Sequence, residues 1–438
     1  MKAHVLKFFL ASAALGLLSC TEAVEAPLLP TEENQDTVNP APEVDVETEN
    51  TKIEVLDRNL VDDNFILINE ASANRVFIMD KNAVIIHEWP LNGNRLGNDA
   101  YLLPNGKLLA MLEDNDAQLK LGGFGGKILL LSKDGDVEWD FKFSSEDFIA
   151  HHDAEMLPNG NIIFQVWERK SAESAVEAGY HSDMELIVDA IFEIDPSSDE
   201  IVWQWHAWDH LVQMHDSLKS NFGDVGSNPQ LVDLNYVADD TGDIMHANGL
   251  TYDAENDIIF LSVNFYSEIW VIDHSTTTDQ ASMHTGGRLN KGGDLIYRFG
   301  NPEAYQNTKG KRLFDHQHYP NLLDGPDLGN MLVFSNGSTE NQSTVYELQL
   351  PKTFSLDPAV DNEPNVVWSF THPELYAPKV SGAERLPNGN TLITEGDFGI
   401  WEVTYDKQVV WKYKEKGFYW RGYHFDKDSE AIKNLDLN

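Results

Sequence analysis

Short runs in which hydrophobic and polar residues alternate follow one another after residue 56, separated by Gly, Asn, Asp and Pro. A period of two is typical of β-strands, and no long stretch shows the period of an amphipathic helix. A turn sequence recurs beside these runs. Its copies are Leu103–Gly106, Leu157–Gly160 and Leu386–Gly389, with degenerate forms at Tyr252–Asn256 and Leu323–Gly325. Because Asn-Gly readily adopts the positive φ angles of a tight hairpin, each copy predicts a turn between two strands.

A second signature consists of two aromatic residues separated by one position. It occurs at residues 139–141, 203–205, 297–299, 368–370 and 411–413, with an early variant at 87–89. Side chains two apart lie on one face of a strand, where aromatic pairs suit packing between stacked sheets. Six copies, 43 to 94 residues apart, predict an all-β chain folded as a six-bladed β-propeller, with about four strands per blade. Insertions are expected at about 166–185 and 207–242. A solenoid is the alternative, but a closed ring leaves fewer strand edges exposed.

The first twenty residues have the form of an export signal. Lys2 and Lys7 precede an apolar run, Phe8–Leu18, and the single Cys of the chain follows at position 20. About 11 apolar residues are too few for a bilayer span of roughly 20. Because Leu-Leu-Ser-Cys resembles the bacterial lipobox, we expect residues 1–19 to be a lipoprotein signal peptide and Cys20 to be lipidated. An ordinary signal peptide is the alternative. Thr21, in place of Asp, favours an outer-membrane location, facing the periplasm or the cell surface.

An acidic, proline-containing segment follows the lipobox. Residues 21 to 52 hold nine acidic residues and four prolines against one base, Lys52. Charge repulsion and proline stiffness favour an extended chain. We therefore expect a disordered linker over residues 20–55 and the propeller over residues 56–438. No later apolar run approaches membrane length, so membrane contact is expected only through the lipid anchor.

Composition excludes several classes of function. Hydrophobic residues make up 42% of the chain and aromatic residues 11%, which excludes wholesale disorder. The formal net charge of −41, from 31 basic and 72 acidic residues, argues against nucleic-acid partners and against docking on anionic lipid. A single Cys excludes a disulfide framework and a Cys-based zinc site.

Three histidines share one position of the repeat. Counting back five residues from the Leu of the turn gives His152 and His318. In the degenerate fourth copy Thr251 takes the place of that Leu, and the same count gives His246, so three successive blades carry His at this position. The same count gives Asn98 and Ser381 in two other blades. The strand before this turn is expected to be the innermost of its blade. Ring closure should therefore bring the three imidazoles together at the propeller axis.

Three convergent imidazoles fit two kinds of chemistry. They are a known catalytic zinc set, with Asp153 and Asp315 available as hydrogen-bonding neighbours, although no two of them have close helical spacing. Alternatively, one neutral imidazole attacks an anionic group, a second protonates the leaving oxygen, and a third stabilises oxyanions.

A set of motifs in fixed order carries a family resemblance over roughly residues 60 to 425. These motifs are His151–Asp153, His246–Leu250, Ser267–Asp273, Phe314–His318, Phe334–Gly337, Ser381–Asn390 and Trp420–Tyr423. Together they resemble the bacterial arylsulfotransferase family.

The resemblance implies a six-bladed propeller and a two-step transfer that needs no diffusible activated-sulfate cofactor and no metal. In this scheme His318 accepts the sulfuryl group from a phenolic sulfate ester and passes it to a phenolic acceptor. His152, His246 and Asn248 would surround the sulfate, and His152 or His246 would protonate the leaving phenolate.

One position departs from the family pattern. The family Arg that follows the His-x-Asn motif is replaced here by Asn264, and a neutral amide lacks the bidentate fork of a guanidinium. Arg421 and Arg385 are the candidate replacements, and we expect Arg385 to lie in a structural strand. This departure favours an alternative function, that of a non-catalytic or altered-specificity extracytoplasmic propeller that binds a small anion or glycan. A metal-dependent hydrolase or lyase on the same scaffold is a third interpretation.

Two further histidines adjoin the expected site. In a regular strand, His151 would point away from His152, so only His152 is expected to face the axis. His316 shares a face with His318, where it would either orient His318 or line the channel.

Overall fold

The computed structural model describes residues 52–238 and 241–437. The expected signal peptide, Cys20 and the linker as far as residue 51 lie outside these residues. Within the described ranges, no helix is both long and apolar enough to cross a bilayer.

Six antiparallel sheets make up most of the described chain. The first holds β2 (Phe65–Glu70), β3 (Arg75–Met79), β4 (Ile85–Glu88) and β27 (Tyr419–Phe425). The second holds β5 (Leu96–Leu102), β6 (Leu108–Glu113), β7 (Gly126–Leu131) and β8 (Val137–Lys142). The third holds β9 (Phe148–Met156), β10 (Ile162–Lys170), β11 (Leu186–Asp195) and β12 (Glu200–His206).

The remaining three sheets follow in chain order. The fourth holds β15 (Ala247–Asp253), β16 (Ile258–Val263), β17 (Glu268–Asp273) and β18 (Tyr297–Phe299). The fifth holds β19 (Gln317–Leu322), β20 (Asn330–Ser335), β21 (Thr344–Gln349) and β22 (Asn365–Phe370). The sixth holds β23 (Gly382–Arg385), β24 (Thr391–Glu395), β25 (Gly399–Val403), β26 (Val409–Lys414) and β1 (Ile53–Leu56).

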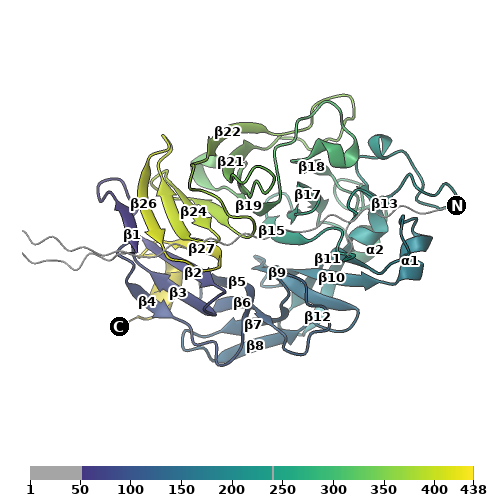
Figure 1. Ribbon diagram of the computed structural model, residues 1–438. Coiled ribbons are helices and arrows are strands. Elements are labelled where there is room, and N and C mark those ends of the chain that lie inside the picture. The colour runs from purple at the N-terminus through teal and green to yellow at the C-terminus, as the bar shows by residue number, and fades with distance from the viewer. Residues whose placement is uncertain (1–51, 239–240, 438) are drawn as a thin grey trace, which may run out of the picture. The chain divides into compact units, whose positions relative to one another are not determined.

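The six sheets form a ring, with β5, β9, β15 and β19 toward its centre (Figure 1). The strand before each turn is the innermost, so the all-β, six-bladed propeller expected from the repeat is confirmed. Ring closure is double. β27, from the end of the chain, pairs with β2, while β1 pairs with β26. These pairings exclude the solenoid.

The expected boundary between linker and propeller, at residues 55 and 56, is wrong because β1 begins at Ile53. The linker was expected to extend to residue 55, but Ile53 and Val55 pair with β26 through their backbone. The sheet begins before residue 56 because β1 covers an edge that β26 would otherwise expose.

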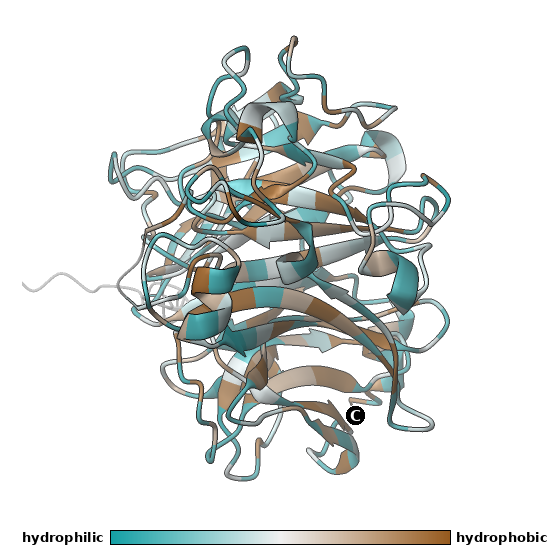
Figure 2. Ribbon diagram, turned by 90° about the vertical axis from the view of Figure 1, so that its right-hand side faces the viewer, coloured by the Kyte–Doolittle hydropathy of each residue, from teal (hydrophilic) through white to brown (hydrophobic). Residues whose placement is uncertain are grey.

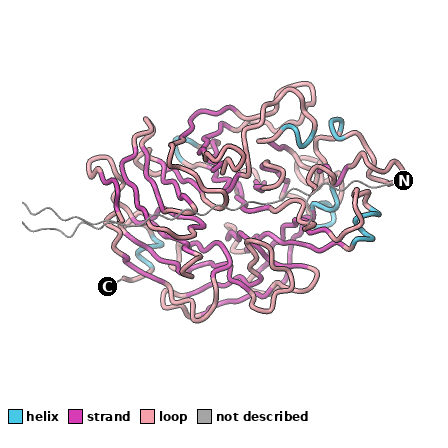
Figure 3. Tube along the Cα trace, in the orientation of Figure 1, coloured by secondary structure: helices cyan, strands magenta, loops and turns pink. Residues whose placement is uncertain are grey.

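Short helices and turns connect the sheets (Figure 3). The α-helices are α1 (Ala172–Glu177), α2 (Thr278–Ala281) and α3 (Glu430–Asn434); the 3₁₀ helices are η1 (Ala207–His210), η2 (Val225–Ser227), η3 (Pro302–Tyr305) and η4 (Gly325–Asp327). A parallel pair, β13 (Leu211–Val212) and β14 (Val232–Asp233), lies in the expected second insertion. The first insertion starts later than expected, because β10 extends to Lys170.

The repeated aromatic pairs lie at the outer side of the sheets, where they pack one blade against the next. Trp203 and Trp205 of β12 belong to one buried cluster with Trp270 of β17, in the following blade. The rings of Trp411 and Tyr413 are stacked, with centroids 6.1 Å apart. Hydrophobic residues follow the strands and hydrophilic residues the loops (Figure 2). The repeated aromatic side chains therefore form contacts between neighbouring blades, as their spacing predicted.

Candidate active site

The three histidines of the repeat register meet at the inner strands. The rings of His152 and His246 have centroids 5.1 Å apart. The indole of Trp420, on β27, lies 5.3 Å from the ring of His152 and 6.2 Å from that of His318. Residues from four blades thus contribute to one cluster, the histidine cluster: His152, His246, His318 and Trp420. The fold brings these positions together, as their shared register predicted.

Irregular backbone positions these side chains. The pairings of β9, β15 and β19 with their neighbours all contain a register shift at this level. His152 and His246 both have φ of 54°, and Tyr319, next to His318, has the same value. Such conformations cost about 1–3 kcal/mol each in residues other than Gly. Bulges re-aim side chains and are common beside active sites, so positive φ angles at or directly beside the three register positions support a functional role.

His318 is held in one tautomer. Its Nδ1 lies 2.7 Å from Oδ1 of Asn336, whose Nδ2 donates to the carbonyls of Ala377 and Val380. Asn336 therefore presents its oxygen, and Nδ1 of His318 carries the proton. The Nε2 lone pair accepts a hydrogen bond from the Val380 N–H at 3.2 Å. Burial, the largest cause, lowers the pKa of His318 to about 3. At neutral pH its Nε2 is an uncharged, nucleophilic nitrogen.

His151 does not point away from His152. Their Nδ1 atoms are 2.8 Å apart, and the ring of His151 stacks on Trp167 with centroids 4.0 Å apart. The expected alternation is wrong here because the left-handed residue His152 lies in a bulge, which breaks the period of the strand. Burial lowers the pKa of both histidines well below the usual value.

Asp189 lies behind His151, with its Oδ1 3.0 Å from Nε2 of that histidine. Its Oδ2 accepts the N–H of Ala247. Burial is the largest cause that raises the pKa of Asp189, to about 8. The carboxyl group is therefore protonated at neutral pH, and the pair with His151 is uncharged.

Asp189→Asn is expected to weaken the loss of stability at alkaline pH. The carboxyl pKa is higher in the folded than in the unfolded state, so its contribution is present at low pH and lost as pH rises toward 8. Asn keeps an acceptor for Ala247 and does not ionise. The unfolding free energy of the wild type should fall by about 1–2 kcal/mol more than that of the variant between pH 6.5 and 8.5. Urea unfolding measures this, with exposed Asp183→Asn as control; parallel pH curves for wild type and Asp189→Asn would contradict it.

His246 has a carboxylate partner. Its Nδ1 lies 2.5 Å from Oδ2 of Asp243, and its ring stacks on Phe265 with centroids 5.0 Å apart. A carboxylate on one imidazole nitrogen fixes the ring and stabilises the imidazolium. Neither Asp243 nor Phe265 was singled out from the sequence, because both lie in segments without a repeated motif.

The two candidate amides support the strand of His318. Nδ2 of Asn248 donates to the carbonyl of Gln317 at 2.8 Å, and Nδ2 of Asn264 does so at 3.4 Å. Oδ1 of Asn264 lies 2.9 Å from Nδ1 of His316. The imidazole of His316 is thus hydrogen-bonded to Asn264, and the side chain of His316 is 38% exposed. Of the two roles considered for His316, lining the channel fits these contacts better.

Arg421 reaches the channel, but two carboxyl groups surround it. Nη1 lies 2.9 Å from Asp153 and 3.4 Å from Asp99, and the guanidinium carbon lies 4.2 Å from the ring centroid of Tyr319. Burial and the neighbouring Asp153 raise the pKa of Asp99 to about 7, against the lowering effect of Arg421. The positive charge of Arg421 is therefore largely balanced by these two carboxyl groups.

Arg385 belongs to the scaffold, as expected. It forms an ion pair with Glu347 and lies over Trp368, with the guanidinium carbon 5.3 Å from the ring centroid. A different guanidinium, that of Arg312, is linked to Asn264 through the hydrogen bonds of Ser267 and His316. Nη2 of Arg312 donates to Oγ of Ser267, which also accepts the N–H of His316. Arg312 was missed because no motif surrounds it.

Two indole N–H groups at the cluster lack partners. Within the described residues, Nε1 of Trp167 and Nε1 of Trp420 are buried without a hydrogen bond. The ring of Trp167 contacts His152 and His246, with centroids 5.4 Å away in each case. Buried donors are nearly always paired in folded proteins. These two donors are therefore candidate contacts for the acceptor oxygens of a ligand.

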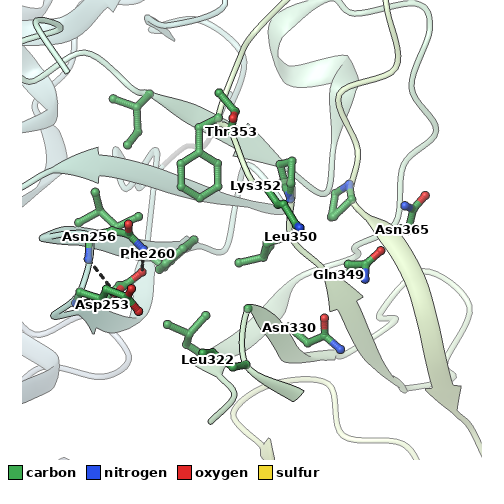
Figure 4. Close-up of a pocket in the computed structure, with 18 of the residues that line it drawn as sticks. Asp253, Asn256, Phe260, Leu322, Asn330, Gln349, Leu350, Lys352, Thr353 and Asn365 are labelled. Carbon is green, nitrogen blue, oxygen red and sulfur yellow. Dashed lines mark hydrogen bonds between the residues drawn. The ribbon is translucent and has the colours of Figure 1, made fainter. Parts of the chain in front are cut away.

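A separate cavity of about 810 Å³ lies between the fourth and fifth sheets (Figure 4). Its walls include Asp253, Phe260, Leu322 and Lys352, and it contains none of the histidines. It is separate from the candidate active site.

Fold and site together define an all-β propeller with a histidine-lined centre. The sequence model of the arylsulfotransferase (ASST) family matches residues 51–420. The chain belongs to this family, whose general chemistry is sulfuryl transfer. No protein of curated function matches it.

Two solved structures show a distant likeness to this chain. A protein of unknown function from Bacteroides caccae is 13% identical, covering 82% of this chain and 98% of its own, with a TM-score of 0.48. BamB from Moraxella catarrhalis is 9% identical, covering 85% of this chain and 81% of its own, with a TM-score of 0.35.

Proposed function

We propose that this protein transfers a sulfuryl group from a phenolic sulfate ester to a phenolic acceptor through a sulfo-histidine at His318. No diffusible activated-sulfate cofactor takes part. The observation that carries this proposal is the fixed tautomer of His318. Asn336 holds the proton on Nδ1, which leaves the lone pair on Nε2. Membership of the arylsulfotransferase family supplies the sulfuryl chemistry.

In the first step, Nε2 of His318 attacks the ester sulfur. The bond between sulfur and the phenolic oxygen breaks, and that oxygen leaves with the electron pair. We assign the proton that it receives to His246, because Asp243 at 2.5 Å stabilises the imidazolium that carries it. In the second step, His246 takes the proton of the acceptor phenol, whose oxygen attacks sulfur and releases His318.

The sulfuryl oxygens need donors while charge spreads over them. The unpaired indole N–H groups of Trp167 and Trp420 suit this role, and the ring of His152 contacts both indole rings. As in phosphoryl transfer, positioning and charge stabilisation supply most of the rate. In this proposal, the buried indole N–H dipoles provide part of the oxyanion stabilisation that the family Arg, replaced here by Asn264, would otherwise supply.

The proposal is tested by release of p-nitrophenol from p-nitrophenyl sulfate, with and without phenol. We expect phenol to accelerate release, because it discharges the sulfo-histidine, and to give parallel double-reciprocal plots. Release that phenol leaves unchanged would contradict transfer. Release that a chelator abolishes would instead support the metal-dependent hydrolase.

A second candidate is a propeller that binds a small anion or glycan without turnover. Asn264 at the family Arg position favours it, as does the pairing of Arg421 with Asp153 and Asp99. A rise in melting temperature with p-nitrophenyl sulfate, without any release of p-nitrophenol, would support this candidate.

The cellular setting is a proposal from the sequence alone. A lipid on Cys20 would hold the propeller at the outer membrane, outside the cytoplasm, with small phenolic molecules as its partners. Loss of the chain from the membrane fraction in a Cys20→Ala variant tests this anchor.

A further inference from the structure

A second group of polar side chains lies outside the histidine cluster, where two connecting segments meet. His210 ends η1, which follows the third blade, while His284 and Asp294 lie in the segment after α2 of the fourth blade. Nδ1 of His210 is 2.8 Å from Oδ1 of Asp294, and Nδ1 of His284 is 2.7 Å from the same oxygen. Among the described residues, only these three form a group of at least three His, Cys, Asp or Glu whose ligand atoms all lie within 4.8 Å of one another.

Both ring nitrogens of His210 face acceptors. Nε2 lies 2.8 Å from the carbonyl oxygen of Ala281, which can only accept, so Nε2 carries a proton. In a neutral imidazole, Nδ1 then has a lone pair aimed at the Asp294 carboxylate. Two facing acceptors need a positive charge between them, either a second proton on His210 or a cation. A histidine whose other N–H binds a backbone carbonyl is the usual arrangement of a metal ligand.

The backbone holds this group in place. The ring of His210 is fully buried and parallel to that of Trp205, with centroids 6.0 Å apart. Nε1 of Trp205 donates to the carbonyl of Gly293, directly before Asp294. A Cβ at Gly293 would lie only 2.4 Å from Nε2 of His210, so the glycine allows the close approach. By contrast, the side chain of His284 is 63% exposed and leaves one side of the group open to solvent.

We propose that His210, His284 and Asp294 bind a divalent transition metal of the zinc class, which joins the segment after the third blade to the fourth blade. Two imidazole nitrogens and one carboxylate oxygen are common zinc ligands, with water as the fourth. Calcium and magnesium prefer oxygen ligands and fit this set poorly. Bond lengths of about 2.0–2.1 Å place tetrahedral ligands about 3.3 Å apart. The distances from Asp294 Oδ1 to Nδ1 of His210 (2.8 Å) and of His284 (2.7 Å) must therefore each widen by roughly half an ångström when the metal binds.

The test measures zinc binding by the full-length protein, purified without a histidine tag and stripped with a chelator. We expect one equivalent of Zn²⁺ to bind at pH 7.5 by calorimetry. His284→Asn should weaken binding on the order of 100-fold or more, since losing even a neighbour of a ligand costs 10–100-fold. Because His284 is exposed, this variant should fold normally. His215→Asn is the matched control, because His215 is an exposed histidine in the segment between β13 and η2.

Thermal unfolding gives a second readout that does not depend on activity. Added Zn²⁺ should raise the melting temperature of the wild type and of His215→Asn, but not that of His284→Asn. Equal zinc affinity in wild type and His284→Asn would overturn the site, as would the absence of binding. In either case a second proton on His210 would account for the geometry. Sulfuryl transfer is independent of this result, because the site contains no residue of the histidine cluster.

Discussion

His318→Asn is expected to lower turnover of p-nitrophenyl sulfate by about 10⁴-fold or more and to abolish the covalent intermediate. The reason is the loss of Nε2, which carries the lone pair because Asn336 holds the proton on Nδ1 and which gives up its hydrogen bond from the Val380 N–H when it attacks. Steady-state assays measure the first effect. Intact mass spectrometry measures the second, as the gain of one sulfuryl group by the wild type after mixing with donor alone.

The control for this prediction is His215→Asn, which makes the same change at an exposed histidine away from the inner strands. It should retain wild-type activity and should still gain the sulfuryl group. Because His318 is buried, the melting temperature of His318→Asn must also be measured, so that an unfolded sample is not mistaken for an inactive enzyme. A folded His318→Asn variant with wild-type turnover would remove the nucleophile from the proposed mechanism.

Arg421→Met is expected to destabilise the propeller by about 3–5 kcal/mol, the range for breaking a buried ion pair. Arg421 lies between Asp153 at 2.9 Å and Asp99 at 3.4 Å, and it is 3% exposed. Without the guanidinium, these two carboxyl groups face each other in the channel, so one must take up a proton. β27 carries Arg421, so the effect falls on the strand that closes the ring. The midpoint and slope of denaturant unfolding measure it.

Arg75→Met is the matched control. Its ion pair with Glu88 has a separation of 2.7 Å, but the side chains are 32% and 40% exposed. Surface pairs contribute about 0–1 kcal/mol. Equal losses in the two variants would show that burial of Arg421 contributes nothing. Adding Asp99→Asn to Arg421→Met should recover part of the stability, since it removes one of the two opposed carboxyl groups.

The fold could be predicted from local patterns in the sequence. Period-two patterns, Asn-Gly turns and repeated aromatic pairs each depend on neighbouring residues, and together they gave the class, the blade number and the innermost strand. The boundary at residue 56 was wrong because β1 is ordered by pairing with β26, at the other end of the chain. Pairing between distant segments leaves little trace in a short sequence window.

The candidate site was readable only in part. The shared register of His152, His246 and His318 predicted their convergence, because equivalent positions in closed blades face one axis. Their partners were not predictable. Asp243 and Asn336 fix the rings of His246 and His318. Asp243 belongs to no motif, and the motif Phe334–Gly337, which contains Asn336, does not indicate which histidine that residue contacts.

The sequence alone determined a ring of six sheets and the level at which three histidines enter its centre, since strand period and turn chemistry act over a few residues. Only the tertiary structure decided the direction and charge of the groups there. A bulge turns His151 toward His152, and carboxyl groups from two other blades neutralise Arg421. Such outcomes depend on packing and burial among residues far apart in the chain, which local sequence patterns do not encode.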